Sequence, residues 1–212
     1  MARLLLVRHG ETEWNETARC QGSSDISLSA TGFQQVEALK RRLVKERIDA
    51  IYSSDLKRAV HTAQIIALEH NTELVTCREL REIDFGEFEG LTFEEIKQRY
   101  PHSNWWTVQD AEEKLPRGES VSQLVSRVSQ FVARLRGYTG GETILVVAHG
   151  GSLRALLCLL LGLGLEHWWR IRLDSASLTV VETYSEGAVL SLLNDLCPVS
   201  YTHLTLPTKR IV

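Results

Sequence analysis

The chain alternates between short apolar runs and longer segments whose apolar residues recur with helical spacing. Residues 4–7 and 143–148 are continuous apolar runs, which is typical of strands buried on both faces of a sheet. Val36, Leu39 and Leu43 share one face of a segment with basic residues between them, as in an amphipathic helix. The whole pattern predicts strands at 4–7, 50–53, 74–77, 143–148, 178–182 and 189–193, and helices at 30–44, 56–68, 93–99, 120–135 and 151–161.

The alternation of strands and helices predicts an α/β fold, a single-domain three-layer α/β/α sandwich with a mostly parallel sheet. A chain of 212 residues can bury one self-sufficient core, and it contains no internal repeat or linker. Ser120 and Gln123 have the spacing of a helix capping box. Residues 83–119 are the least regular part, and we expect the Trp105–Trp106 and Trp168–Trp169 pairs to be core or pocket-lid residues.

The end of the chain differs from the rest. Residues 198–212 contain no acidic residue and no helical or strand period, and the segment SYTHLTLPT resembles translated sequencing-adapter sequence. We therefore expect the domain to span residues 1–197 and residues 198–212 to form a non-native or disordered tail.

Composition and charge exclude several classes of protein. Hydrophobic residues make up 43% of the chain and charged residues 24%, which is ordinary for a globular protein, and the net charge of −3 offers no basic excess for nucleic acid. The most apolar stretch, residues 155–165, is too short for a membrane span of about 20 residues. The four cysteines form no C-x-x-C pair, which is typical of free thiols. We expect a cytoplasmic monomer or homodimer with no nucleic-acid or membrane partner.

Two apolar strands are each followed by a histidine and a glycine. Arg8, His9 and Gly10 follow the first strand, and His149 and Gly150 follow the strand at 143–148. Because parallel strands end at the same edge of a sheet, both histidines are expected at the edge where ligands bind. The helices that follow direct N–H groups toward this edge. Cations and N–H donors gathered in an acidic protein favour a phosphate as the ligand.

Other phosphatase and hydrolase chemistries lack their motifs. No cysteine is followed six residues later by arginine, no two aspartates lie two apart, and no Walker loop or G-x-S-x-G motif occurs. No cluster with metal-ligand spacing occurs either, so we expect neither a metal nor a cofactor.

Taken one at a time, several of these residues have ordinary structural interpretations. A single histidine at a sheet edge is more often structural than catalytic, and an isolated Arg58 is by default a solvated helix residue. The acidic residues between 79 and 89 are by default surface residues, and the spacing alone does not choose among them. These residues are Glu79, Glu82, Asp84, Glu87 and Glu89.

Six segments in order resemble the histidine phosphatase superfamily, which includes the cofactor-dependent phosphoglycerate mutases. They extend over the chain from residue 4 to about 195, and together they are far more specific than R-H-G alone. The segments are LLLVRHGETEWN (4–15), QGSSDISLSATGFQQ (21–35), IYSSDLKRAVHTA (51–63), LREIDFGEFEGLT (80–92), GES (118–120) and VVAHGGSLRA (146–155).

The resemblance implies a role for each matching residue. His9 matches the nucleophile that becomes phosphohistidine, and Glu82 matches the acid that protonates the leaving alcohol. An alkoxide leaves poorly at pH 7, which explains why such an acid is needed. The residues that match the phosphate and substrate contacts are Arg8, Asn15, Gln21, Gly22, Arg58, Glu82, His149 and Gly150.

The branch of the family follows from the surroundings of these residues. Phosphoglycerate mutases carry a long insertion between the catalytic glutamate and the second histidine, whereas Glu82 and His149 are only 67 residues apart. Ile83 and Phe85 stand where mutases have arginine and tyrosine. The segment 80–96 is most similar to alpha-ribazole phosphatases, although Arg117 replaces their usual glycine before G-E-S. The resemblance implies a phosphomonoesterase, with alpha-ribazole 5′-phosphate as the expected substrate; a mutase and a non-catalytic member of the fold are the alternatives.

Overall fold

The computed structural model describes residues 1–101, 103 and 114–196. The Trp105–Trp106 pair and the segment 198–212 lie outside these described residues. The strands are β1 (Ala2–Arg8), β2 (Ala50–Ser53), β3 (Leu74–Thr76), β4 (Thr143–Ala148), β5 (Leu178–Tyr184) and β6 (Gly187–Asp195). The α-helices are α1 (Glu13–Glu16), α2 (Ala30–Leu43), α3 (Lys57–Ala67), α4 (Phe93–Arg99), α5 (Val121–Leu135) and α6 (Gly150–Leu161). Short 3₁₀ helices lie at η1 (Arg78–Leu80), η2 (Gly86–Phe88) and η3 (Leu165–Arg170).

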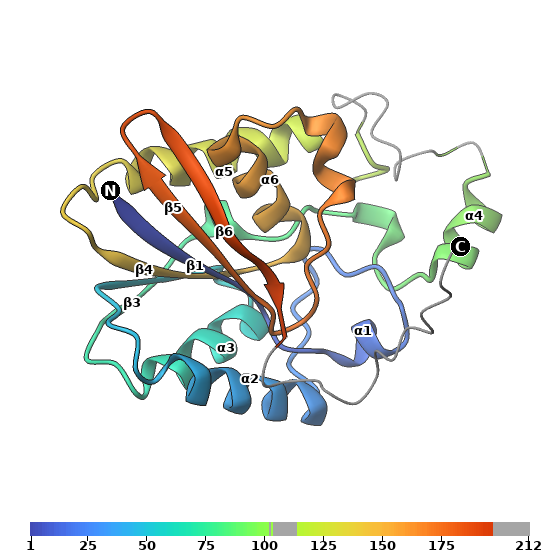
Figure 1. Ribbon diagram of the computed structural model, residues 1–212. Coiled ribbons are helices and arrows are strands. Elements are labelled where there is room, and N and C mark those ends of the chain that lie inside the picture. Colours follow the sequence, from blue (N-terminus) through green and yellow to red (C-terminus); the bar gives the residue numbers. More distant parts are fainter. Residues whose placement is uncertain (102, 104–113, 197–212) are drawn as a thin grey trace, which may run out of the picture.

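The six described strands form one sheet in the order β3-β2-β4-β1-β5-β6. Neighbouring strands from β3 to β1 run parallel, whereas β5 is antiparallel to β1 and β6 is antiparallel to β5. Helices α2 and α3 lie on one side of the sheet and α5 and α6 on the other (Figure 1). The predicted α/β/α sandwich with a mostly parallel sheet is therefore confirmed.

Alternate residues of the central strands supply the two cores. Leu5 and Val147 are fully buried with the apolar residues of α2 and α3, and Leu4 and Val146 are fully buried with those of α5 and α6. This arrangement explains why residues 4–7 of β1 and 144–148 of β4 are apolar without interruption, since a side chain on either face meets a helix. Each such side chain contributes roughly 1.5–3 kcal/mol through burial.

Most predicted elements agree with the structure to within a residue or two at each end. The Ser120–Gln123 capping box is present at the start of α5. The hairpin strands β5 and β6 are longer than predicted, because pairing continues to Tyr184 and Gly187 at the turn. The pattern did not predict α1, because this helix has only four residues and is fixed by the capping box of Thr12 and Asn15.

The register of the sheet brings the predicted site together. Arg8 at the end of β1 is paired with Ala148 at the end of β4, and Ser53 at the end of β2 is paired with Val147. The N–H of His9 donates to the carbonyl of Ala148 at 3.0 Å, so the parallel pairing continues to the two histidines. Within the described residues, no helix combines the length and the apolar character that a membrane crossing requires.

Candidate active site

His9 and His149 lie side by side at the carboxyl edge of the sheet. Their ring centroids are 5.0 Å apart, and their exposed fractions are 3% and 0%. Both side chains follow directly from paired parallel strands, so the backbone of the sheet fixes their separation. The sequence prediction that both histidines reach one edge is therefore correct.

The hydrogen bond of His9 determines which ring nitrogen is available for chemistry. Nδ1 of His9 lies 2.7 Å from the carbonyl oxygen of Gly10. A carbonyl only accepts, so Nδ1 carries the hydrogen and Nε2 keeps its lone pair. Burial and the neighbouring guanidinium groups of Arg58 and Arg8 hold the pKa of His9 well below its usual value. The ring is therefore neutral at pH 7, with Nε2 in the form of a nucleophile.

His149 has the opposite tautomer. Nε of Arg58 donates to its Nδ1 at 3.2 Å, so the hydrogen of the neutral ring is on Nε2. Nε2 of His149 is buried and has no hydrogen-bond partner among the described residues. Burial is the main cause, and the charge of Arg58 the next, that holds the pKa of His149 well below its usual value. His149 thus offers a neutral N–H donor beside His9.

Arg58 is fully buried in the first turn of α3 and contacts the loop between α1 and α2 as well as His149. Its Nη1 and Nη2 donate to the carbonyls of Ser24 and Gly22 at 2.7 and 2.6 Å. Burial lowers the pKa of Arg58 to about 10, which still leaves it charged at pH 7. The interpretation of Arg58 as a solvated helix residue is therefore wrong.

Arg8 is held at the rim of the site by the segment before β5. Its Nη1 donates to the carbonyl of Leu173 at 2.7 Å, whereas its Nε is buried without a partner among the described residues. Burial lowers the pKa of Arg8, and the nearby Glu82 carboxylate acts in the opposite direction. Arg8 therefore has a donor in the site that an anion can take.

Glu82 lies in an irregular segment between η1 and η2 and is only 8% exposed. Both carboxylate oxygens accept from the N–H of Gly151 at 3.0 Å, and one also accepts from the N–H of Ile83 at 2.9 Å. Glu82 therefore occupies the N–H of Gly151, one of the N-terminal groups of α6 that were expected to face this edge. The first turn of α3 is bound in the same way, by Asp25 to the N–H of Lys57 at 2.7 Å.

The other acidic residues near Glu82 have structural partners outside the cavity. Glu79 pairs with Arg134, and Asp84 accepts from the N–H of Gly86. Glu87 accepts from the hydroxyl of Tyr100. Glu89 accepts from the N–H groups of Ser23 and Ser24. Of these five acidic residues, Glu82 is the one whose side chain lines the same cavity as His9.

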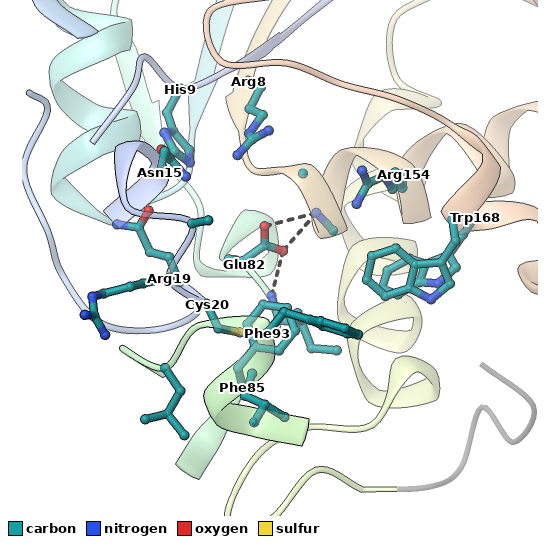
Figure 2. Close-up of a pocket in the computed structure, with 18 residues that line it drawn as sticks. Arg8, His9, Asn15, Arg19, Cys20, Glu82, Phe85, Phe93, Arg154 and Trp168 are labelled. Carbon is teal, nitrogen blue, oxygen red and sulfur yellow. Dashed lines mark hydrogen bonds between the residues drawn. The ribbon is translucent and has the colours of Figure 1, made fainter. Parts of the chain in front are cut away.

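A cavity of about 350 Å³ is lined by Arg8, His9 and Glu82, and Figure 2 shows these three side chains turned toward its centre. His149 and Arg58 lie behind His9 and are not part of this lining. Aromatic side chains form much of its wall: Phe85, Phe93, Trp168 and Trp169. The prediction that Trp168 and Trp169 are core or pocket residues is confirmed, since Trp168 is buried and both line this cavity. Phosphate-binding groups at one end and aromatic rings at the other suit a phosphorylated small molecule.

The remaining predicted contacts lie around the same cavity. Asn15, Gln21 and Gly150 line it. The side chain of Asn15 also caps α1, and Gln21 accepts a hydrogen bond from the hydroxyl of Thr12 at 2.9 Å. Gly22 does not line the cavity but accepts a hydrogen bond from Arg58 through its carbonyl. A Cβ at this position would collide with the carbonyl of Ile83.

Arg154 was missed by the sequence analysis. It lies on α6 and lines the cavity, with Nε donating to the carbonyl of Ile171 at 2.7 Å. Its guanidinium carbon is 5.3 Å from the ring centroid of Trp169. The signal was present in the sequence, since Arg154 is the charged residue directly before the apolar run 155–161 on a buried helix.

The described part of the chain holds no group of three or more His, Cys, Asp or Glu side chains arranged to bind a metal ion. Its three cysteines, Cys20, Cys77 and Cys158, are free thiols, as predicted, and Cys197 lies outside the described residues. Arg8, Arg58 and Arg154 contribute positive charge around the site.

Comparison with known proteins agrees with this geometry. Phosphoserine phosphatase 1 of Hydrogenobacter thermophilus is 36% identical over 198 residues, which cover 93% of this chain and 94% of that protein. The alpha-ribazole phosphatase of Shigella flexneri superimposes with a TM-score of 0.83 at 30% identity, covering 92% of this chain and 96% of its own. A phosphoserine phosphatase mutant of Entamoeba histolytica in complex with phosphoserine superimposes with a TM-score of 0.82 at 30% identity. The match covers 92% of this chain and 98% of that protein's chain.

Residues 4–196 match the sequence profile of the histidine phosphatase superfamily (branch 1). This range contains most of β1, all of β2 to β6 and all the residues of the cavity described above. The chain is therefore a phosphatase that belongs to branch 1 of the histidine phosphatase superfamily.

Proposed function

We propose that the chain hydrolyses a small phosphomonoester through a phosphohistidine intermediate on His9. The observation that carries this proposal is the pair of opposite tautomers at the sheet edge. His9 offers a bare Nε2, and His149 offers an Nε2–H donor, with the ring centroids 5.0 Å apart. One nitrogen can attack phosphorus while the other binds a phosphoryl oxygen.

In the first step, the lone pair of His9 Nε2 attacks phosphorus and the bond from phosphorus to the alcohol oxygen breaks. Glu82, when protonated, gives its proton to that oxygen, so a neutral alcohol leaves and phosphohistidine remains. His149 and the Nε of Arg8 offer their buried donors to the phosphoryl oxygens, and Asn15 lies on the same cavity. A donor aimed at developing charge in such a site is worth ~10²–10³ in rate.

In the second step, Glu82 acts in reverse. Its carboxylate removes a proton from water, the water oxygen attacks phosphorus, and the bond from phosphorus to Nε2 breaks. Inorganic phosphate, neutral His9 and protonated Glu82 are regenerated, so protons and electrons balance. The N–H groups of Gly151 and Ile83 hold the carboxylate in place for both steps. These residues supply the chemistry without a metal or a cofactor.

Alpha-ribazole 5′-phosphate is our expected substrate. Its bulky base and ribose need an apolar wall beside the phosphate site, and Phe85, Phe93, Trp168 and Trp169 offer one. The likeness to the alpha-ribazole phosphatase of Shigella flexneri supports this choice. Monomeric or homodimeric organisation and a domain of residues 1–197 belong to the same proposal.

A phosphorylated hydroxy acid such as phosphoserine is a second candidate. Arg154 is the observation in its favour, because its charged group lines the cavity and suits a substrate carboxylate. The phosphoserine phosphatase of Hydrogenobacter thermophilus and the phosphoserine complex from Entamoeba histolytica point in the same direction.

Released phosphate measured on a panel of esters tests these proposals. The panel contains alpha-ribazole 5′-phosphate, phosphoserine, 3-phosphoglycerate and 4-nitrophenyl phosphate, with His9→Ala as the inactive control. The variant Arg154→Met should raise KM for phosphoserine about tenfold or more if its carboxylate binds there, and should change KM for alpha-ribazole 5′-phosphate less. Isomerisation of 3-phosphoglycerate that depends on a bisphosphoglycerate primer would identify a mutase. No turnover of any ester would favour a non-catalytic member of the fold.

A further inference from the structure

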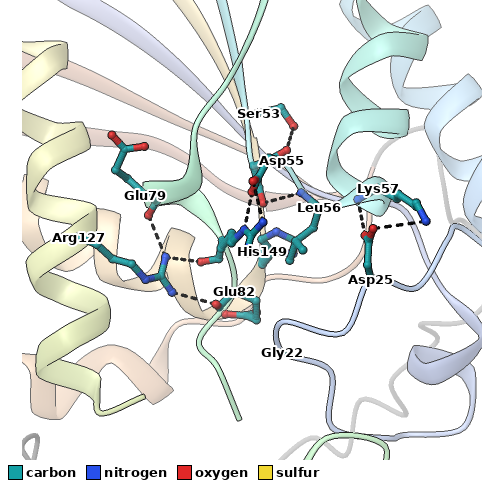
Figure 3. A network of polar contacts seen from close by, with 12 residues as sticks. Gly22, Asp25, Ser53, Asp55, Leu56, Lys57, Glu79, Glu82, Arg127 and His149 are labelled. Atoms are coloured by element: carbon teal, nitrogen blue, oxygen red, sulfur yellow. Dashed lines mark hydrogen bonds and ion pairs between the residues drawn. The ribbon is translucent and has the colours of Figure 1, made fainter. Parts of the chain in front are cut away.

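The segment that carries Glu82 is bound by a single guanidinium group. Arg127, on α5, donates from Nη1 to the carbonyls of Glu79 and Arg81 at 2.9 and 2.6 Å. Its Nη2 donates to the carbonyl of Glu82 at 2.9 Å. Figure 3 shows Arg127 reaching from its helix to these carbonyls from the side away from His149.

The remaining donors of Arg127 bind Glu119. Nε and Nη2 reach the two carboxylate oxygens at 2.8 and 2.9 Å. An arginine has five N–H donors, and this arrangement uses all of them: two on one carboxylate and three on three carbonyls. Glu119 in turn accepts from the N–H of Asp84 at 3.3 Å, and its own N–H donates to the carbonyl of Asp84 at 2.8 Å. The pair therefore holds the chain on both sides of Glu82.

This support matters because residues 81–85 belong to no helix or strand. The carboxylate of Glu82 is tied at its far end to Gly151 and Ile83, and the carbonyl of Glu82 is tied to Arg127. Arg127 does not line the cavity that contains His9, but lines a separate cavity behind Glu82. It can reach the reaction only through the backbone or through its charge.

We propose that Arg127, held by Glu119, is a positioning residue that fixes the proton-transferring carboxylate of Glu82 against the leaving oxygen. The inference rests on the proposed function of Glu82. A misplacement of about 1 Å can cost on the order of 10²-fold in rate, so loss of the clamp should impair the step that needs the acid. Lysine cannot replace Arg127 here, because it has three donors and no planar fork.

The test compares two phosphate esters in single-turnover reactions. For β-glycerol phosphate, whose alkoxide must be protonated, Arg127→Met and Arg127→Lys should each lower the rate about 10- to 10²-fold. For 4-nitrophenyl phosphate, whose phenolate leaves unaided, the loss should be clearly smaller. In a Glu82→Gln background, the Arg127 variants should cost little more, because the group that they position is already absent.

A matched control lies on the same helix. Arg134 pairs with the carboxylate of Glu79 and contacts the sulfur of Cys77, but has no contact with Glu82. Arg134→Met should keep the wild-type ratio of the two rates. If Arg127→Met does not fold, Glu119→Gln keeps the shape of its side chain and should show the same dependence on the leaving group to a smaller extent.

Three results would overturn the inference. Equal losses for both esters, or losses that multiply in the Glu82→Gln background, would show that Arg127 acts independently of Glu82. Full rescue by Arg127→Lys would show that its charge matters and its geometry does not. Acid-labile phosphate on His9 of the wild-type protein is measured in parallel, because it tests the proposed function by itself. If that label forms, the three results above refute only the role of Arg127. If it does not form, both the proposed function and the role of Arg127 are refuted.

Discussion

Nε of Arg58 donates to Nδ1 of His149 over 3.2 Å, and this hydrogen bond determines the tautomer of the His149 ring. Because Nδ1 accepts, the single hydrogen of neutral His149 is on Nε2, where it can bind a phosphoryl oxygen. The carbonyl of Gly10 imposes the opposite tautomer on His9. In the proposed mechanism, two histidines from equivalent strand ends therefore take different roles, one as nucleophile and one as hydrogen-bond donor.

The first prediction concerns the protonation of His9. Its pKa is lowered by burial and then by Arg58 and Arg8, so neutral His9 should persist below pH 6.5. Arg58→Met removes one of these causes and should move the pKa upward. Titration of the His9 ring by NMR in the free enzyme checks this, with His9→Ala to assign the signal. A titration midpoint that is unchanged in Arg58→Met would contradict the electrostatic role of Arg58.

The same pKa shifts affect stability. His9 and His149 have lowered pKa values in the folded protein, so the unfolded chain binds more protons below about pH 6.5. The free energy of unfolding should therefore fall as the pH falls through this value. His9→Asn removes one of the two groups and should make the pH dependence less steep.

The second prediction concerns Gly151. A Cβ at this position would overlap an oxygen of Glu82, whereas at Gly150 the nearest atom of Glu82 would be 3.7 Å away. Gly151→Ala should displace the carboxylate and lower the rate for β-glycerol phosphate by ~10²-fold or more. The melting temperature should change little, because alanine suits a helix. Gly150→Ala is the comparison and should lose less; equal losses would show that contact with Glu82 is not the cause.

The sequence predicted the sheet well, because its signals are local. Apolar runs bounded by polar residues located β1 and β4, and their shared edge brought His9 and His149 together. The position of Glu82 depends instead on long-range contacts, namely the N–H of Gly151 and the side chain of Arg127, 69 and 45 residues away. No periodicity encodes such contacts. Only the family resemblance selected Glu82 in advance.

Arg154 shows a second limit of the sequence. On a buried helix a charged residue needs a partner or a ligand, but the sequence does not say which face of α6 meets the cavity. The structure shows that this face packs against η3 and the residue after it, where the ring of Trp169 and the carbonyl of Ile171 contact Arg154. Short 3₁₀ helices such as η3 are too brief to show a period in the sequence, so sequence patterns do not reveal this part of the cavity wall.

The third prediction is turnover without a metal. The proposed mechanism obtains its positive charge from Arg8 and Arg58, and its proton from Glu82. Phosphate release in excess EDTA should equal the rate without it. The control is a parallel assay with added Mg²⁺, and a large loss in EDTA that Mg²⁺ restores would contradict the mechanism.

The fourth prediction concerns the end of the chain. Residues 198–212 have no apolar period with which to join the core. Deletion of Pro198–Val212 should leave both the melting temperature and the rate for 4-nitrophenyl phosphate close to those of the full chain. A decrease of several degrees in the melting temperature would show that the segment packs against the domain.

The fifth prediction separates the roles of His9 and Glu82. His9→Ala removes the nitrogen that bonds to phosphorus, so both phosphate release and acid-labile labelling of the protein should be lost. Glu82→Gln nearly keeps the shape of the side chain but cannot give or take the proton. Its amide can still accept from the N–H of Gly151, so the fold and phosphate binding should survive.

The penalty of Glu82→Gln should depend on the leaving group. For β-glycerol phosphate, whose alkoxide must be protonated, the rate should fall ~10²–10⁴-fold, the usual range for general acid catalysis. For 4-nitrophenyl phosphate, the phenolate leaves without a proton and the transfer step should lose less. Single-turnover rates are needed, because slow attack of water on phosphohistidine would otherwise hide the difference. Equal losses for the two esters would mean that Glu82 is not the acid, and Asp84, Glu87 and Glu89 would then be tested in the same way.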